Sequence, residues 1–183
     1  MRTFFAVFFH RQVTDAIARN QDRCRDLGVK GKYVDPENIH LTVKFIGEID
    51  PQDAERMEPL ASEVAGVGSL TLQLDDLGIF PPKGRPKVLW QGLSGTDIEK
   101  LKSLHQQVED YCAETIDVER EKRKFHPHVT LARSPNIPTG INIKGNQDID
   151  LEKPIFQVDY LSLMKSELSP KGPGYKALKH FKL

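Results

Sequence analysis

The segments IHLTV at residues 39–43 and PHVTL at residues 127–131 share the pattern His-apolar-Thr-apolar. Both lie in stretches whose other residues are typical of β-strands. Because successive side chains of a strand point to opposite faces, the His and Thr of each segment should project together from one face. His40 and His128 are 88 residues apart in a chain of 183 residues. This spacing predicts two similar halves that each contribute one His and one Thr.

The composition is that of an ordinary globular protein. With 38% hydrophobic and 28% charged residues, the chain differs from disordered and membrane-embedded proteins. We expect a single domain over residues 1–183 with two pseudo-symmetric lobes. The 26 Lys and Arg residues balance 26 Asp and Glu residues. Since proteins that follow long nucleic acids usually carry a basic excess, this balance favours a small or terminal phosphate ligand.

The cysteines and the N-terminal segment bear on the cellular compartment of the protein. Cys24 and Cys112 are far apart in the sequence, so neither a disulfide framework nor a CxxC metal site is indicated, and a reduced, cytoplasmic setting is expected. The apolar run at residues 4–9 is too short for a membrane span and is interpreted as a buried strand. We expect a monomer with no membrane attachment and no obligate protein partner.

The order of the predicted elements repeats. A strand at residues 2–9, a helix at 12–27 and a strand at 39–46 are followed by a strand from residue 88, a helix at 97–113 and the second motif. This recurrence favours a duplicated α+β fold. The other predicted elements are a helix at 51–64, a strand at 70–80, an irregular loop at 134–152, a strand at 158–163, a turn at 169–174 and a strand at 175–183.

Two imidazoles on one substrate point to acid–base chemistry. Because imidazole titrates near pH 6.5, one His can be protonated while the other is neutral, which is the minimum for hydrolysis by a paired general acid and base. Hydroxyls of Thr42 and Thr130 can donate to anionic oxygens. The chain has no G-x-S-x-G elbow, phosphate loop or H-E-x-x-H motif, so a phosphate diester suits it better than a peptide bond. The pattern requires no cofactor.

Two alternatives to this enzyme hypothesis remain open at the level of sequence. His126 could bind a metal ion together with His128 and His40, although the sequence singles out no fourth ligand. The chain could also be a non-catalytic module in which the histidines only recognise a phosphate or an RNA 3' end.

The chain resembles the bacterial and archaeal RNA 2',3'-cyclic phosphodiesterases, also known as 2'-5' RNA ligases, of the 2H phosphoesterase superfamily. The resemblance covers essentially the whole length and rests on residues 3–7, 35–48, 88–90, 125–133 and 172–175. It implies an α+β, two-lobed, pseudo-duplicated fold with two antiparallel sheets around a central cleft and helices on the outside.

The resemblance also implies an activity and residue roles. The expected reaction is metal-independent hydrolysis of a 2',3'-cyclic phosphate, on RNA or a nucleotide, to a 2'-phosphomonoester, with reversible 2'-5' RNA ligation as a minor activity. His40 is expected to be the proton donor and His128 the proton acceptor. Thr42 and Thr130 are expected to bind the phosphate.

Three further residues are candidates for contact with the substrate, and a fourth is assigned to the core. Arg133 could neutralise phosphate charge, but its odd offset from His128 places it on the opposite strand face unless a bulge intervenes. By family analogy, Tyr33 is a candidate for stacking on a base. Tyr175 either lines the cleft or caps the last strand. Phe45 is assigned to the core rather than to a stacking platform.

Overall fold

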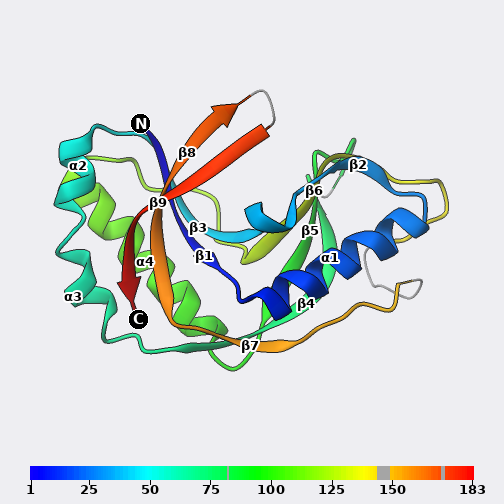
Figure 1. The fold of residues 1–183 in the computed structure, drawn as a ribbon, viewed down its shortest axis with the longest axis horizontal. Helices are drawn as coiled ribbons and strands as arrows, with labels where there is room; N and C mark the ends of the chain where they lie inside the picture. Colours follow the sequence, from blue (N-terminus) through cyan, green and yellow to red (C-terminus); the bar gives the residue numbers. More distant parts are fainter. Residues whose placement is uncertain (82, 144–148, 170–171) are drawn as a thin grey trace.

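The computed structural model describes residues 1–81, 83–143, 149–169 and 172–183 (Figure 1). The helical elements are α1 (Arg11–Asp26), the short 3-10 helix η1 (Pro36–Asn38), α2 (Pro51–Arg56), α3 (Leu60–Val64) and α4 (Ile98–Ile116). The strands are β1 (Arg2–Phe8), β2 (Lys30–Tyr33), β3 (His40–Glu48), β4 (Leu70–Phe80), β5 (Val88–Ser94), β6 (His128–Asn136), β7 (Ile155–Val158), β8 (Tyr160–Ser169) and β9 (Gly172–Lys182).

The strands form one curled antiparallel sheet in the order β7-β4-β5-β6-β3-β1-β8-β9, with β2 also paired to β6. The prediction of two sheets is therefore corrected. There are two sheet halves, a first half of β3, β1, β8 and β9 and a second half of β6, β5, β4 and β7. Their His-bearing strands β3 and β6 pair directly, and this contact is the single register pair Leu41 and Val129. That pair joins the halves because each His-bearing strand is the inner edge of its half.

The predicted duplication agrees with the order of the elements. In the first half, β1, α1 and β3 follow one another along the chain, and in the second half β5, α4 and β6 do the same. Within each half the His-bearing strand pairs with the first strand of its repeat. The two repeats therefore place their His-bearing strands at equivalent positions on either side of the joint.

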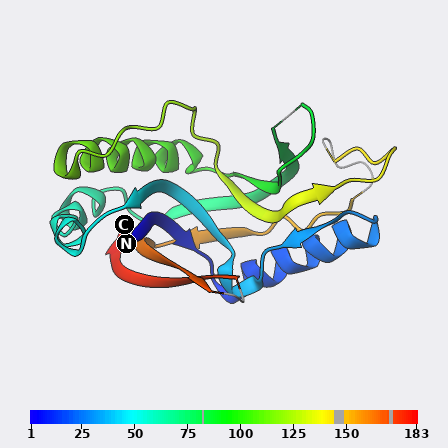
Figure 2. The ribbon, with the colours of Figure 1, turned by 90° about the horizontal axis from the view of Figure 1, so that it is seen from above.

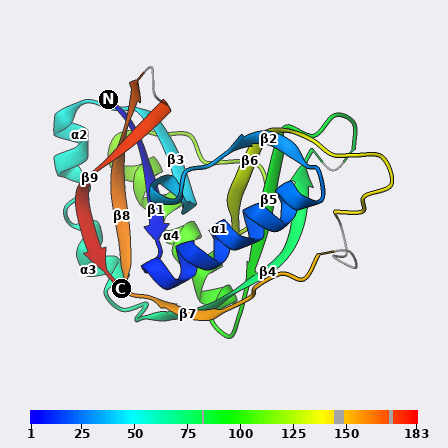
Figure 3. The ribbon, with the colours of Figure 1, turned by 45° about the vertical axis from the view of Figure 1, so that its right-hand side comes forward.

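The two long helices each pack against strands of the other repeat, and α4 also contacts β4 of its own half. Helix α1 lies across β4, β5 and β6 in Figure 3, and its Gln21 side chain donates to the carbonyl of Leu131 in β6. Helix α4 lies on the side of β3, α2 and α3 in Figure 2. Its Tyr111 hydroxyl donates to the carbonyl of Arg56 in α2.

Several predicted boundaries are wrong for identifiable reasons. The helix expected at residues 51–64 is divided into α2 and α3, since Pro59 has no N–H to continue the helix and disfavours helical geometry in the residue before it. Strand β2 was not predicted, because it is short, polar and largely exposed. Strands β6, β8 and β9 extend into segments expected to be loop or turn, and β7 ends at Val158, where the next predicted strand was expected to begin. Residues 144–148 of the predicted loop and 170–171 of the predicted turn lie outside the described residues.

The N-terminal apolar run and both cysteines are part of the buried core. Phe5 and Val7 of β1 are fully buried, which confirms the predicted buried strand. Cys24 of α1 and Cys112 of α4 are buried free thiols, and burial raises their pKa values to about 11 and about 12. Both thiols are therefore protonated at neutral pH. Within the described ranges, none of the helices is long and apolar enough to span a membrane.

Candidate active site

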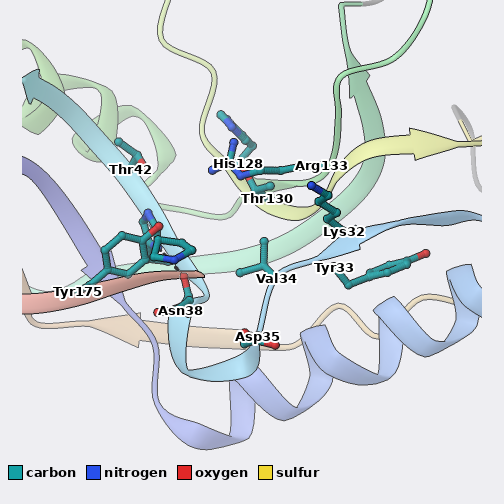
Figure 4. Close-up of a pocket in the computed structure, with 12 residues that line it drawn as sticks. Lys32, Tyr33, Val34, Asp35, Asn38, Thr42, His128, Thr130, Arg133 and Tyr175 are labelled. Atoms are coloured by element: carbon teal, nitrogen blue, oxygen red, sulfur yellow. Dashed lines mark hydrogen bonds between the residues drawn. The ribbon is translucent and has the colours of Figure 1, made fainter. Parts of the chain in front are cut away.

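Both His-x-Thr motifs face one cavity at the joint between the sheet halves (Figure 4). The cavity measures about 200 Å³. Leu41 and Val129, the residues that pair across the joint, directly follow the two histidines, so the joint itself brings the motifs together. The residues that line the cavity are Lys32, Tyr33, Val34, Asp35, Asn38, His40, Thr42, His128, Thr130, Arg133, Pro173 and Tyr175.

Strand β3 has a bulge directly after its motif. Thr42 pairs with Ala6 of β1, and Lys44 pairs with the next residue, Phe5, so Val43 is an extra residue in the register. Val43 and Lys44 are both buried, although they are consecutive. The bulge reverses the alternation of faces for the residues that follow it.

Strand β6 has a bulge at the equivalent position. Thr130 pairs with Trp90 of β5, and Ala132 pairs with Leu89, which leaves Leu131 as the extra residue. Leu131 and Ala132 are again consecutive and buried. The two motifs therefore share a backbone irregularity as well as a residue pattern.

The bulges determine which face Arg133 and Phe45 occupy. Arg133 is five residues after His128 and lies on the same face, lining the cavity, because the bulge compensates for the odd offset. Phe45 occupies the equivalent place after His40, and 51% of its surface is exposed, so its assignment to the core was wrong. It lines an adjoining cavity with His40 and Thr42, and the Arg2 guanidinium lies 4.9 Å from its ring centroid.

Each catalytic candidate is oriented by the carbonyl two residues before it. Nδ1 of His40 is 2.7 Å from the carbonyl oxygen of Asn38, and Nδ1 of His128 is 2.7 Å from that of His126. Since a carbonyl only accepts hydrogen bonds, Nδ1 carries the hydrogen in both rings. Nε2 is consequently the atom of each imidazole that gains or loses a proton.

Aromatic rings surround both imidazoles. The His40 ring lies 5.0–5.5 Å, between centroids, from those of Phe4, Phe8 and Tyr175. The His128 ring lies 5.1 Å from that of Phe80 and 6.1 Å from that of Trp90. These contacts restrict rotation of the two imidazoles and shield part of each ring from water.

Burial lowers the pKa of both histidines below the ordinary value. For His40, desolvation is the main cause, and the positive charges of Arg133 and His128 add to it. For His128, desolvation is again the main cause and His126 adds to it. The hydrogen bond from each Nδ1 to its carbonyl opposes the shift in both cases. The neutral imidazole is thus favoured until an anion occupies the cavity.

The two tyrosine candidates both line the cavity but differ in orientation. Tyr175 lies edge-on to His40, with its ring 5.0 Å away. The Tyr33 hydroxyl donates to the carbonyl of Val29, and the Arg25 guanidinium lies 4.0 Å from the ring centroid. Burial raises the pKa of Tyr33 to about 12. The Arg25 guanidinium therefore already covers one face of the Tyr33 ring.

His126 is exposed and packs edge-on against Trp90, with the ring centroids 4.6 Å apart. It does not line the cavity that holds His40 and His128. Across the residues that the structure describes, no group of three or more His, Cys, Asp or Glu side chains is placed to hold a metal ion.

Sequence reasoning missed Lys32, which lines the cavity from β2 and pairs in register with Arg133. It also missed the buried ion pair behind the first motif, between Lys44 of β3 and Glu109 of α4. A polar, short β2 gives no periodic signal for Lys32. For Lys44, the signal was a lysine at an otherwise apolar position of the first motif.

Comparison with protein families gives a match in two segments. Residues 7–90 and 95–175 match the model of the LigT-like phosphoesterases. Each segment contains one of the two His-x-Thr motifs.

Curated proteins with similar sequences share one description. The RNA 2',3'-cyclic phosphodiesterase of Aeropyrum pernix is 37% identical over 166 residues, which cover 88% of this chain and 92% of the relative. That of Thermotoga maritima is 32% identical over 179 residues, covering 97% and 93%.

Two solved structures share the fold. TT0787 of Thermus thermophilus matches with a TM-score of 0.78 and 27% identity, over 100% of this chain and 98% of the other. Apo LigT of E. coli matches with a TM-score of 0.78 and 24% identity, over 100% and 96%.

Proposed function

The chain belongs to the LigT-like phosphoesterase family, and from this membership we propose that it hydrolyses the 2',3'-cyclic phosphate of an RNA 3' end, or of a nucleotide, to a 2'-phosphomonoester. Its homologues over nearly the full length are RNA 2',3'-cyclic phosphodiesterases. The observation that carries the proposal is the pair of imidazoles in one cavity, each with Nδ1 bound to a carbonyl and Nε2 available for proton transfer.

In the proposed reaction, Nε2 of neutral His128 accepts a proton from water as the water oxygen attacks phosphorus. The bond from phosphorus to O3' breaks, and Nε2–H of protonated His40 gives its proton to O3'. The bond from phosphorus to O2' remains, so the product is a 2'-phosphomonoester with a free 3'-hydroxyl. The donor and acceptor roles follow the family resemblance. The two imidazoles supply both proton transfers, so the step needs no metal ion or cofactor.

The remaining residues of the cavity would hold the anion and the nucleoside. Hydroxyls of Thr42 and Thr130 can donate to the non-bridging oxygens, and the Arg133 guanidinium can offset the charge that develops on them. Phe45 and Tyr175 line the adjoining cavity and offer apolar surface for a base. Tyr33 lines the opposite part of the main cavity and is a second candidate for base contact.

The direct test is to incubate the protein with an RNA oligonucleotide that ends in a 2',3'-cyclic phosphate, in the presence of EDTA. We expect complete conversion to a 2'-phosphomonoester, which ³¹P NMR distinguishes from the 3' isomer. A 3'-phosphomonoester would contradict departure of O3', and loss of turnover in EDTA that zinc restores would contradict the metal-free mechanism. Binding without turnover would instead support a non-catalytic RNA-end module.

Ligation uses the same chemistry, with an RNA hydroxyl in place of water. Because water is in large excess, we propose that 2'-5' joining is the minor reaction. Efficient joining without detectable hydrolysis would contradict this order.

The dependence of kcat/KM on pH should be bell-shaped, with its maximum below about pH 6.5. One imidazole must be protonated and the other neutral, so the maximum lies midway between the two apparent pKa values of the free enzyme. Both pKa values are lowered by burial, which moves both limbs to lower pH.

Bound phosphate favours the imidazolium form, so the profile of kcat should lie at higher pH than that of kcat/KM. Initial rates between pH 4.5 and about 9 at saturating and limiting substrate provide both profiles. A maximum of kcat/KM above pH 7, or a flat profile, would exclude the proposed pair as the titrating groups.

A further inference from the structure

We propose that Lys32 and the basic loop between β4 and β5, which carries Lys83, Arg85 and Lys87, bind the phosphodiester backbone on the 5' side of the terminal cyclic phosphate. The site would then select the ends of RNA chains over free nucleotides. This inference rests on the proposed function and specifies its substrate class.

Lys32 lies on the same face of the sheet as the phosphate-binding candidates. It pairs in register with Arg133 across β2 and β6, and Val88 pairs with Arg133 from the other side. Side chains directly opposite each other in an antiparallel pair project from the same face. Lys32 and Arg133 accordingly line the same cavity, as Figure 4 shows.

The basic loop starts and ends beside the cavity. Phe80, the last residue of β4, has its ring 5.1 Å from that of His128. The loop returns at Val88, the register partner of Arg133, and the N–H of Ser134 donates to the carbonyl of Lys87. Residues 81–87 contain three cationic residues and no acidic one. A chain that leaves the cavity past His128 and Arg133 therefore meets these cations.

The exposed cations of this side are not neutralised by neighbours. Lys32, Lys83, Arg85 and Lys87 are exposed, and no carboxylate of the described residues forms an ion pair with them. The formal charge of the whole chain is zero. The positive charge beside the cavity therefore results from where these cations lie and not from an excess of basic residues in the chain.

Charge at two other rims of the cavity, at η1 and on β8, favours a phosphodiester less than the rim of Lys32 does. Asp35, the residue before η1, lines the cavity and Glu37 of η1 is exposed, so a phosphodiester there would meet negative charge. On β8, the charge of Lys165 is offset by Glu167 at 2.8 Å. Among these three rims, that of Lys32 and the basic loop offers uncompensated positive charge.

The test compares two substrates with the same terminal nucleoside, a nucleoside 2',3'-cyclic phosphate and a trinucleotide that ends in the same cyclic phosphate. The wild type should have the higher kcat/KM for the trinucleotide. Lys32→Gln, and separately the triple change of Lys83, Arg85 and Lys87 to Gln, should each reduce this preference about tenfold. The dependence of log(kcat/KM) for the trinucleotide on log salt should become shallower by about 0.7 for each phosphate that the variant no longer binds.

A matched control removes the same number of charges far from the cavity. Arg11, Lys122 and Arg56 are well exposed, and none of them lines it, so changing all three to Gln should leave the preference unaltered. Equal kcat/KM for both substrates in the wild type, or the same preference in the variants as in the wild type, would overturn the inference.

A binding measurement distinguishes failure of this inference from failure of the proposed function. A fluorescent trinucleotide with a 2'-phosphate end is the expected product and requires no turnover, so its affinity can be measured by anisotropy. If the cyclic phosphate is not hydrolysed but Lys32→Gln still weakens binding of this probe, the proposed function fails and the backbone site stands. If hydrolysis occurs and Lys32→Gln binds the probe as tightly as wild type, only the backbone site fails.

Discussion

Replacing His128 with Asn should lower kcat for hydrolysis of a cyclic phosphate by about 100- to 10,000-fold, and His40→Asn should have an effect of the same order. The Asn amide can still donate to the carbonyl that each Nδ1 now contacts, but it has no group at Nε2. The substitution thus removes proton transfer while keeping the local hydrogen bond.

The double variant gives a sharper result than either single variant. If both imidazoles act in one step, the losses should not add, because removal of one partner already disables the paired mechanism. Stopped assays with a cyclic phosphate substrate measure the rates, and thermal unfolding checks that each variant is folded.

His126→Ala is the matched control, since it removes an imidazole two residues from His128 that lies outside the cavity. It keeps the carbonyl that accepts from His128, so activity should stay within a few-fold of wild type. A loss as large as that of His128→Asn would favour the metal-binding alternative. Wild-type rates for His40→Asn or His128→Asn would exclude the proposed mechanism.

Glu109→Ala should destabilise the protein by about 3–5 kcal/mol. Lys44 and Glu109 side chains are only 2% and 4% exposed, and Nζ lies 2.7 Å from Oε2. Removing the carboxylate leaves a buried ammonium without its counter-charge. It also removes the acceptor of the Glu121 N–H, which holds the segment leading to the second motif.

Replacing both partners should cost less than replacing one. In Lys44→Met combined with Glu109→Met, no buried charge remains, so stability should recover most of the loss. Urea unfolding of the wild type, Lys44→Met, Glu109→Met and the double variant measures the coupling. A change of about 2–4 °C in Tm is expected for each kcal/mol in a domain of this size.

The exposed pair of Lys102 and Glu99 is the control for this cycle. Lys102→Met should change stability by less than about 0.5 kcal/mol, because exposed ion pairs contribute little. If Glu109→Ala changes the free energy of unfolding as little as the control does, the buried pair does not stabilise the packing of α4 on β3.

The sequence was sufficient to predict that the four motif residues meet in one site. The strand period placed His40 with Thr42 and His128 with Thr130, and the repeated order of elements indicated two equivalent halves. The structure places all four side chains around one cavity. These predictions depend on local periodicity, which a single sequence carries directly.

Features that depend on pairing between distant segments could not be predicted. A bulge at Val43 or Leu131 adds no unusual residue, so the sequence allowed two faces for Arg133 and led to the wrong location for Phe45. The direct pairing of Leu41 with Val129 joins segments 88 residues apart, and no local pattern distinguishes one joined sheet from two. Lys32 belongs to β2, whose formation depends on its partner β6.

Because α1 covers strands of the second half and α4 covers strands of the first, neither half is an independent folding unit. A fragment that ended between the two repeats would expose the apolar face that its missing helix protects, and would also lack one of the two imidazoles. Unfolding is therefore expected to be cooperative across the joint. In this molecule, the symmetry of the strands describes two halves, whereas the packing of the helices makes them a single thermodynamic unit.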